Sequence, residues 1–253
     1  MALLEEFEES GNWLFRWRSY LPLVLGVLIF SGLSYFKYPF GSHRLDELWE
    51  VVCLCVSVSG LLVRALTIGF AAGRTSGRNT ERQVADSLNT TGMYSIVRNP
   101  LYLGNFLMVL GVVIFLRIWW IPLLYMLLFT VYYERIIFAE EMFLRRKFGK
   151  SYLDWAARTP AFLPKLSHWR SPALPFSWRK VLRREYHGAF GVIMAMFLLE
   201  VTSDWSVGRG LVIEGMWKYI LSFSVGTYVV LRFLHKHTKV LKAGRQQKNS
   251  VAT

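Results

Sequence analysis

Runs of hydrophobic residues set the pattern along this chain, and polar stretches separate them. The runs lie at 20–36, 48–70, 101–116, 118–138, 187–203 and 216–234. Each run is close to the length that an α-helix needs to cross a bilayer, which is about 20 residues. The pattern therefore predicts an all-α fold, a polytopic membrane helix bundle with six transmembrane helices.

The third and fourth runs are joined only around Arg117, which predicts a tight helical hairpin over 101–138. Both runs are short, so the hairpin either crosses the membrane or dips into it. The last two runs have a second interpretation, a pair of interfacial helices. We expect one membrane domain at 20–234, after a cytoplasmic segment at 1–19 and before a basic, disordered tail at 235–253.

Charge orients the predicted bundle. The chain of 253 residues is 53% hydrophobic and has a formal net charge of +13. The segments 71–99, 135–186 and 235–253 are all basic, and cytoplasmic segments of membrane proteins carry the excess of Lys and Arg. We therefore expect an integral membrane protein with both termini in the cytoplasm. The basic groups flank the spans, where they meet anionic lipid headgroups, so no nucleic-acid partner is expected.

The two cysteines do not indicate a metal site. Cys53 and Cys55 form C-x-C inside the second run, without further Cys or His ligands close in sequence. Helix positions two apart point to different sides. We expect two small membrane-buried residues and no metal.

Polar residues stand at the start of the third run, in the stretch "SIVRNPLYLGNF". Asn99 is a favoured N-cap residue, and Pro100 suits the first helical position. Tyr102 then lies in the first turn, and Arg98 lies just outside the helix. Backbone N–H groups and the helix dipole at such an end favour an anion. The alternative is a capped membrane helix with an interfacial Arg and Tyr.

Carboxylates stand at the end of the fourth run. Glu134, Glu140 and Glu141 are costly there unless they meet a cation, water or a ligand. Glu141 and Arg145 are four apart and could pair on one helix face. A hairpin also brings its two open ends together, so we expect Glu140 and Glu141 to face Arg98 at the cytoplasmic surface. A ligand with an ammonium, a carboxylate and a planar ring would suit such a site, and S-adenosylmethionine has all three.

The motifs resemble a known superfamily. "TTGMYSIVRNPLYLG", the pair "EE" and "FGKSYLDWAARTPAFLP" are similar to the integral-membrane methyltransferases, which include isoprenylcysteine carboxyl methyltransferases and phospholipid N-methyltransferases. The resemblance covers about 90–165, within an expected methyltransferase core at 71–165. It implies S-adenosylmethionine near the cytosolic face and a lipid that enters sideways from the bilayer. The matching positions are Gly92, Tyr94, Arg98, Pro100, Tyr102, Gly104, Glu140, Glu141, Phe148, Gly149 and Tyr152, with Arg158 close to a basic position of the family.

The resemblance also implies roles for these residues. The catalytic candidates are Arg98, Asn99 and Tyr102, and the cofactor-binding candidates are Tyr94, Pro100, Tyr102, Gly104, Glu140 and Glu141. The family usually has His where this chain has Asn99. An amide can hydrogen-bond a ligand but cannot carry a proton near neutral pH, so we expect a positioning role at this residue.

The absence of that His favours an acceptor that needs no base, namely an anionic oxygen. Arg binds phosphate bidentately, and the substrate-binding candidates are Arg74, Arg78, Arg82, Arg158, Arg183 and Arg184. Attraction to lipid headgroups is the simpler explanation for the same residues.

Two further stretches, "TSGRNTERQVADSLNTTG" and "LPFSWRKVLRREYHG", resemble a bacterial branch that methylates the 1-phosphate of Kdo-lipid A. This resemblance implies a lipid phosphate acceptor and the bacterial inner membrane. Prenylcysteine carboxyl methylation and phospholipid amine methylation are the other enzymatic alternatives. A membrane scaffold or transporter is the non-enzymatic one, with Arg64 and Glu200 lining a pathway.

Overall fold

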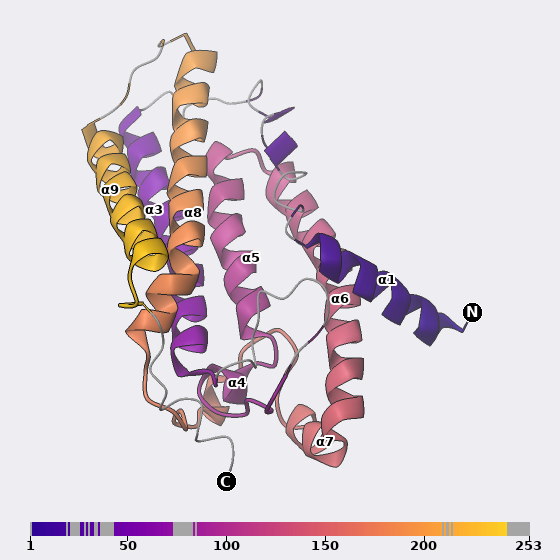
Figure 1. Cartoon of the computed structure of the whole chain (residues 1–253). Coiled ribbons are helices and arrows are strands. Elements are labelled where there is room, and N and C mark those ends of the chain that lie inside the picture. Colours follow the sequence, from indigo (N-terminus) through magenta and orange to yellow (C-terminus); the bar gives the residue numbers. More distant parts are fainter. Residues whose placement is uncertain are drawn as a thin grey trace.

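The structure is a computed structural model that describes most of the chain. The described residues are 2–18, 43–72, 85–208 and 215–241, with the single positions 20, 26, 27, 29, 31, 32, 35, 83, 210 and 213 between them. All elements among them are helical, which confirms the all-α prediction (Figure 1). They are α1 (Leu3–Trp17), α3 (His43–Phe70), α4 (Met93–Ile96), α5 (Pro100–Val113), η3 (Ile114–Leu116), α6 (Trp120–Phe148), α7 (Lys150–Ala156), η4 (Leu166–His168), α8 (Trp178–Ser206) and α9 (Gly215–His237).

Three described helices, α3, α6 and α8, are long and apolar enough to cross a membrane. A shorter apolar helix covers Pro100–Leu116, and α9 covers the predicted run at 216–234. The predicted run at 20–36 falls largely outside the described residues, so the count of six spans stays a prediction. Two helices extend well beyond the apolar runs, because α6 continues past 138 to Phe148 and α8 begins at Trp178, before 187.

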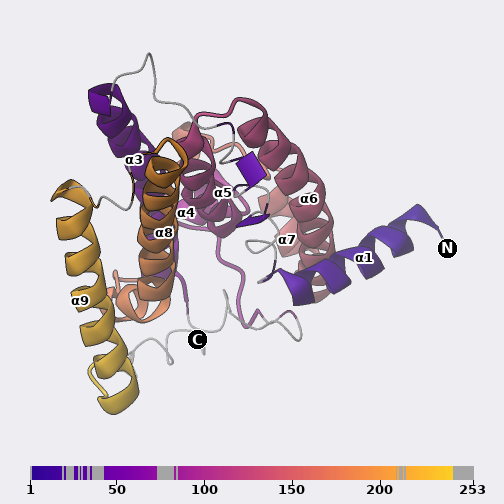
Figure 2. The ribbon, with the colours of Figure 1, turned by 90° about the horizontal axis from the view of Figure 1, so that it is seen from above.

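The bundle has two sides. Seen from above in Figure 2, α9 lies at one edge and α1 at the other, with α8, α5 and α6 between them. α3 packs against α5 and α8, whereas α1 packs on α6. The N-terminal helix is therefore part of the folded unit and lies on the α6 side of it.

Small residues bring α3 and α5 together. A Cβ atom on Gly60 would lie only 2.5 Å from the Gly104 carbonyl oxygen, and one on Gly111 would overlap Ser57. The Ser57 hydroxyl donates a hydrogen bond of 2.7 Å to the Met108 carbonyl. Close backbone approach through small residues is a common way to pack membrane helices, and here it fixes α5 against α3.

Cys53 and Cys55 point to different sides of α3, as predicted from their spacing. Cys53 is buried, and Cys55 is exposed on the helix surface.

The predicted hairpin is present. α5 and η3 end at Arg117, whose φ of 56° turns the chain, and α6 begins at Trp120. Between the two helices the Tyr125 ring stacks on that of Phe106 with the centroids 5.5 Å apart, and the Tyr125 hydroxyl donates to the Phe106 carbonyl at 3.0 Å. The start of α5 and the end of α6 lie toward the end of the bundle where α4 and α7 are found (Figure 1).

A closing segment, residues 157–170, lies across the open end of the hairpin. Its backbone pairs with the segment before α5, because the Arg98 N–H donates to the Pro160 carbonyl at 2.8 Å and the Lys165 N–H to the Ile96 carbonyl at 2.9 Å. Phe162 from this segment packs between the helices of the hairpin, with its ring near those of Phe106 and Phe129. The closing segment thus holds the two open ends in place.

Candidate functional site

Arg98 and Glu141 meet at the open end of the hairpin. The Arg98 Nη1 atom lies 3.2 Å from Glu141 Oε2, and both side chains are largely buried. Arg98 is held there because its own N–H is bonded to the closing segment. The two polar clusters therefore face each other, as the hairpin argument predicted, and the ion pair of Glu141 is with Arg98 across the site.

Three buried polar atoms gather at this point. Arg98 Nε, Glu141 Oε1 and the Tyr152 hydroxyl have no hydrogen-bond partner among the described residues. Tyr152 comes from α7, and burial together with the neighbouring Glu141 carboxylate raises its pKa above the usual value. Unpartnered buried polar groups are rare in proteins and commonly mark a place where a ligand or water binds. The site thus offers a donor, an acceptor and a hydroxyl to one ligand.

Glu140 forms the second half of the site. Its carboxyl group interacts with the Tyr102 hydroxyl, and its Oε1 atom lies 4.0 Å from Arg18 Nη1. Tyr102 is buried, with its ring 4.7 Å from that of Tyr133. The two consecutive glutamates of α6 are therefore each paired with a different arginine. Sequence analysis missed Arg18, because one basic residue at the end of an amphipathic helix gives no signal that it reaches a site.

Asn99 stands at the N-cap position of α5, and Pro100 is the first helical residue, as predicted. The prediction that the Asn99 side chain caps the helix was wrong. This side chain makes no cap hydrogen bond, and the Asn99 backbone has φ and ψ of −120° and 57°. Its Nδ2 atom instead donates to the Ala161 carbonyl at 3.0 Å. Asn99 thus ties the start of α5 to the closing segment, and its side chain serves positioning.

Tyr94 and Gly104 make different contacts. The carbonyl of Tyr94 accepts a hydrogen bond from Trp155 Nε1 at 3.0 Å, and burial together with the Glu140 carboxylate raises the pKa of Tyr94. A Cβ atom on Gly104 would overlap the side chain of Arg64 on α3. The glycine is therefore explained by helix packing, and its role toward a cofactor stays a prediction.

The predicted substrate-binding residues lie in different places. Arg74, Arg78 and Arg82 fall outside the described residues. Arg158 and Arg183 are exposed, and Arg158 Nε donates to the Asp154 carbonyl in the last turn of α7. Arg184 is half-buried on α8 and close enough to Tyr94 to lower its pKa, against the larger effect of burial. Of the three described candidates, Arg184 is the one whose charge acts on a motif residue, Tyr94.

Arg64 is committed to a structural network. Its Nε and Nη2 atoms bond both oxygens of Glu185 on α8 at 2.6 and 2.8 Å, and Nη1 bonds the Asn105 side chain on α5 at 2.5 Å. A bidentate Arg–carboxylate pair fixes geometry as well as charge. This network joins α3, α5 and α8, which weakens the transporter interpretation of Arg64 as a pathway residue.

Glu200 belongs to a second buried polar cluster. Carboxylate oxygens of Asp46, Glu50 and Glu200 lie within 4.8 Å of one another, a spacing that could hold a metal ion. Asp46 is paired with Arg117, and Glu50 accepts a hydrogen bond of 2.8 Å from Trp217 Nε1. Sequence analysis did not foresee this cluster, because its members come from α3 and α8, far apart in the chain.

Comparisons with known proteins agree with the motifs. Residues 53–151 match the phospholipid methyltransferase family. The nickel-cobalt-cadmium resistance protein NccN of Alcaligenes xylosoxydans xylosoxydans is 33% identical over 157 residues, 61% of this chain and 66% of that protein. The cobalt-zinc-cadmium resistance protein CzcN of Cupriavidus metallidurans is 33% identical over 156 residues, 61% of this chain and 64% of that protein.

A third relative is named for an enzymatic activity. The protein-S-isoprenylcysteine O-methyltransferase of Schizosaccharomyces pombe is 27% identical over 158 residues, 58% of this chain and 66% of that protein. The chain thus spans slightly less than two thirds of the length of these relatives. No solved structure matches it.

Fold, motifs and comparisons define an all-helical integral membrane protein. The family match over residues 53–151 and the isoprenylcysteine relative support membership of the superfamily of membrane methyltransferases that includes the phospholipid and isoprenylcysteine enzymes. The matched region contains Arg98, Glu140 and Glu141, whereas α1, the closing segment, α8 and α9 lie outside it.

Proposed function

We propose that this protein transfers a methyl group from S-adenosylmethionine to an anionic oxygen of a membrane lipid. The observation that carries the proposal is a group of three buried atoms, on Arg98, Glu141 and Tyr152, that have no hydrogen-bond partner among the described residues. They come from the link before α5, from α6 and from α7, and all three residues belong to motifs that resemble those of the family. A bound ligand with both an anionic and a cationic group would satisfy them together.

The charges of the site fit an amino-acid moiety. Glu140 and Glu141 would hold its ammonium, and the Arg98 guanidinium, which lies at the start of α5, would hold its carboxylate. The buried rings of Tyr102 and Tyr133 would flank the neighbouring cation, because aromatic faces attract cations. S-adenosylmethionine supplies, when bound, a methyl group on a sulfonium. The task of the protein is to align the acceptor with that methyl group and to exclude water.

The class of acceptor follows from the lack of a base at position 99 of the site. Asn99 cannot act as a base, and its side chain is bonded to the closing segment. An acceptor that is already an anion needs no base. We therefore favour a lipid phosphate of the lipid A type, with Arg184 beside Tyr94 as the described residue best placed to bind it. A prenylcysteine carboxylate is the alternative acceptor that is also an anion. A phospholipid amine, the other alternative, is not an anion.

The same proposal includes the orientation of the protein in the membrane. The basic residues near the site, in the last turn of α6 and the first turns of α8, are Arg145, Arg146, Lys147, Arg179, Lys180, Arg183 and Arg184. By the positive-inside rule this end of the bundle faces the cytoplasm, with both termini on the same side. The protein would then act in the inner membrane of a bacterium and take its lipid from the bilayer.

The direct test is incorporation of labelled methyl groups. Membranes from cells that produce the wild-type protein or Glu141→Gln are incubated with methyl-labelled S-adenosylmethionine, and lipids are extracted and analysed by mass spectrometry. We expect a lipid heavier by one methyl group in the wild type alone. Glu134→Gln is the matched control, because Glu134 lies exposed on the same helix. Failure of the purified wild-type protein to bind S-adenosylmethionine would reject the proposal.

A further inference from the structure

Helix α1 lies outside the matched family region but is tightly docked on α6. Gly11 sits directly against the Arg135 backbone carbonyl, where a Cβ atom would overlap it. The Tyr132 hydroxyl donates to the Leu14 carbonyl at 3.0 Å, and the Arg135 guanidinium lies 3.5 Å from the centroid of the Phe7 ring. These contacts follow one face of α1 along most of its length, so the helix has a defined position on α6.

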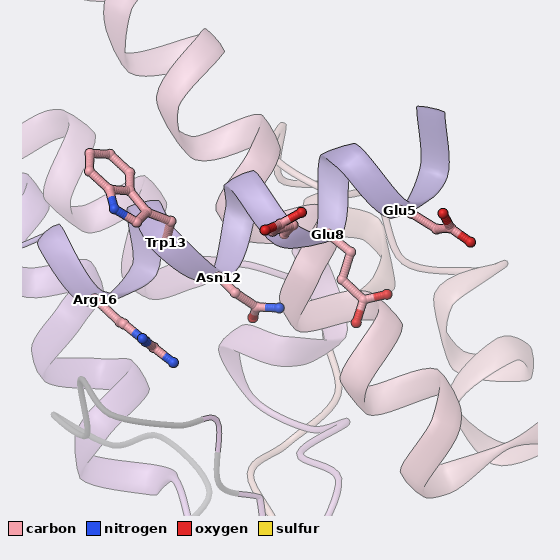
Figure 3. A pocket seen from close by; sticks show the side chains of 6 residues that line it. Glu5, Glu8, Asn12, Trp13 and Arg16 are labelled. Carbon is pink, nitrogen blue, oxygen red and sulfur yellow. The ribbon is translucent and has the colours of Figure 1, made fainter. Parts of the chain in front are cut away.

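The side of α1 away from Gly11 is mostly exposed, although Glu8 pairs with Arg146 of α6 and Asn12 accepts a hydrogen bond of 3.3 Å from Gln83. It carries a shallow pocket, and Figure 3 shows Arg16 beside Asn12 and Trp13 along it. The residues that line the pocket are Glu5, Glu8, Glu9, Asn12, Trp13 and Arg16. Positions two apart on a helix point to nearly opposite sides. Arg16 is accordingly exposed on this face, whereas Arg18 at the end of the helix is largely buried.

Arg18 reaches the site described above. Its Nη1 atom lies 4.0 Å from Glu140 Oε1, and its guanidinium carbon lies 4.0 Å from the centroid of the Phe15 ring. The Glu140 carboxyl group interacts with the hydroxyl of Tyr102, whose ring lies 4.7 Å from that of Tyr133. Arg18 therefore faces the same aromatic surroundings as the glutamate.

Glu140 needs such a partner. Its carboxyl group lies next to the Tyr102 hydroxyl and beside a second carboxylate, Glu141. A carboxylate at the end of an apolar helix is costly unless a cation meets it. Arg98 is already bonded to Glu141, so the cation paired with Glu140 is the one from α1. The separation of 4.0 Å is longer than a hydrogen bond, which leaves the carboxylate oxygens able to bind a ligand.

We infer that α1 contributes to the site and that Arg18 is a positioning residue, which pairs with Glu140 and orients it toward the cation of the cofactor. This inference rests on the proposed function. Each glutamate of the pair would then have its own arginine, Arg98 for Glu141 and Arg18 for Glu140. The N-terminal helix would contribute to cofactor affinity although it lies outside the matched region.

The test measures binding of S-adenosylmethionine to the purified full-length protein in detergent, by calorimetry. Arg18→Gln should weaken binding about tenfold, as expected for loss of one charged interaction, and Arg18→Lys should restore part of it. Arg16→Gln is the matched control and should bind as the wild type does. In a Glu140→Gln background, Arg18→Gln should have no further effect, because Arg18 acts through Glu140.

A second variant tests the docking of α1 and leaves Arg18 in place. Gly11→Val would push α1 away from the Arg135 carbonyl and should weaken cofactor binding as Arg18→Gln does, with an unchanged helical circular-dichroism spectrum. Unchanged or tighter binding in Arg18→Gln would overturn the inference, and so would an equal loss in the Glu140→Gln background. Absence of binding in the wild type would instead reject the proposed function, so the two failures are distinguishable.

Discussion

Arg98 and Glu141 are separated by the whole α5–α6 hairpin, yet Arg98 Nη1 and Glu141 Oε2 lie 3.2 Å apart. One oxygen of Glu141 is used in this contact, and the other is buried without a partner among the described residues. An ion pair that served stability alone would be expected to satisfy its remaining polar atoms. We therefore expect this pair to bind a ligand as well as to stabilise the fold.

The first prediction concerns Glu141. Glu141→Gln keeps the shape of the side chain but removes the charge that a ligand ammonium would meet. Affinity for S-adenosylmethionine should fall about tenfold or more, since a charged hydrogen bond contributes about 1.5–3 kcal/mol. Calorimetry on the purified variant measures the loss, and Glu134→Gln on the exposed face of the same helix should bind normally. Equal affinities for all three proteins would assign the Arg98–Glu141 pair to folding alone.

The second prediction concerns the guanidinium of Arg98. Arg98→Ala should abolish methyl transfer, and Arg98→Lys should restore only part of it, because an ammonium keeps the charge but not the planar fork. The readout is transfer of labelled methyl groups into extracted lipid. Arg16→Lys is the control, as Arg16 is exposed on α1 and is no candidate for substrate or cofactor binding. Full activity in a folded Arg98→Ala protein would show that Arg98 is merely an interfacial anchor.

Much of this site was predictable from the sequence. Two apolar runs joined by a very short link must form a hairpin, and a hairpin places its open ends together, so the motifs at those ends predict that Arg98 and Glu141 lie close to each other. The same reasoning did not find Arg18 or the cluster of Asp46, Glu50 and Glu200. Those contacts join helices that are distant in the chain, and helix packing, which local periodicity does not encode, decides them.

Asn99 shows the same limit at a single residue. Local rules correctly placed it before a helix that begins at Pro100, and from that position they predicted a side-chain cap. The side chain instead bonds the Ala161 carbonyl, in a segment that follows the whole hairpin. A tertiary hydrogen bond replaced the local one, and sequence rules for helix ends do not include such competition.

The third prediction follows from that hydrogen bond. Asn99→His should be tolerated, because an imidazole N–H can still donate to the Ala161 carbonyl and His is usual in the resembling family. Asn99→Asp should lower activity, since two acceptors would then face each other. Methyl transfer is measured from pH 5 to 9. The His variant should gain an activity step between about pH 6 and 7 that the wild type lacks. A wild-type step in that range would mean that another group titrates.

The fourth prediction tests the packing of α3 on α5. Gly111→Val should destabilise the protein by about 1–3 kcal/mol, because the added atoms would overlap Ser57 and the α3 backbone in a closely packed interface. Thermal unfolding in detergent gives the measurement. Gly191→Val on α8 is the control, as a Cβ atom there meets nothing within 4 Å. Similar unfolding temperatures for both variants would contradict the close approach of the two helices.

The last prediction separates binding from stability at Tyr152. Its hydroxyl is buried without a partner among the described residues, so Tyr152→Phe should leave the thermal stability near neutral pH unchanged or slightly higher. The same variant should weaken binding of S-adenosylmethionine, because the ligand would lose a hydroxyl that lies beside Arg98 and Glu141.

The pH dependence of stability has a definite sign at this residue. Burial and the Glu141 carboxylate raise the pKa of Tyr152 in the folded protein above the usual value of 10.0, so ionisation of Tyr152 does not change the stability below that pH. As the pH rises further, the unfolded chain loses this proton first, and the folded protein is destabilised relative to it. Tyr152→Phe should therefore reduce the fall in unfolding temperature above about pH 10. Tyr219→Phe is the control, since Tyr219 is exposed on α9. Equal slopes in the two variants, with normal cofactor binding in both, would remove Tyr152 from the site.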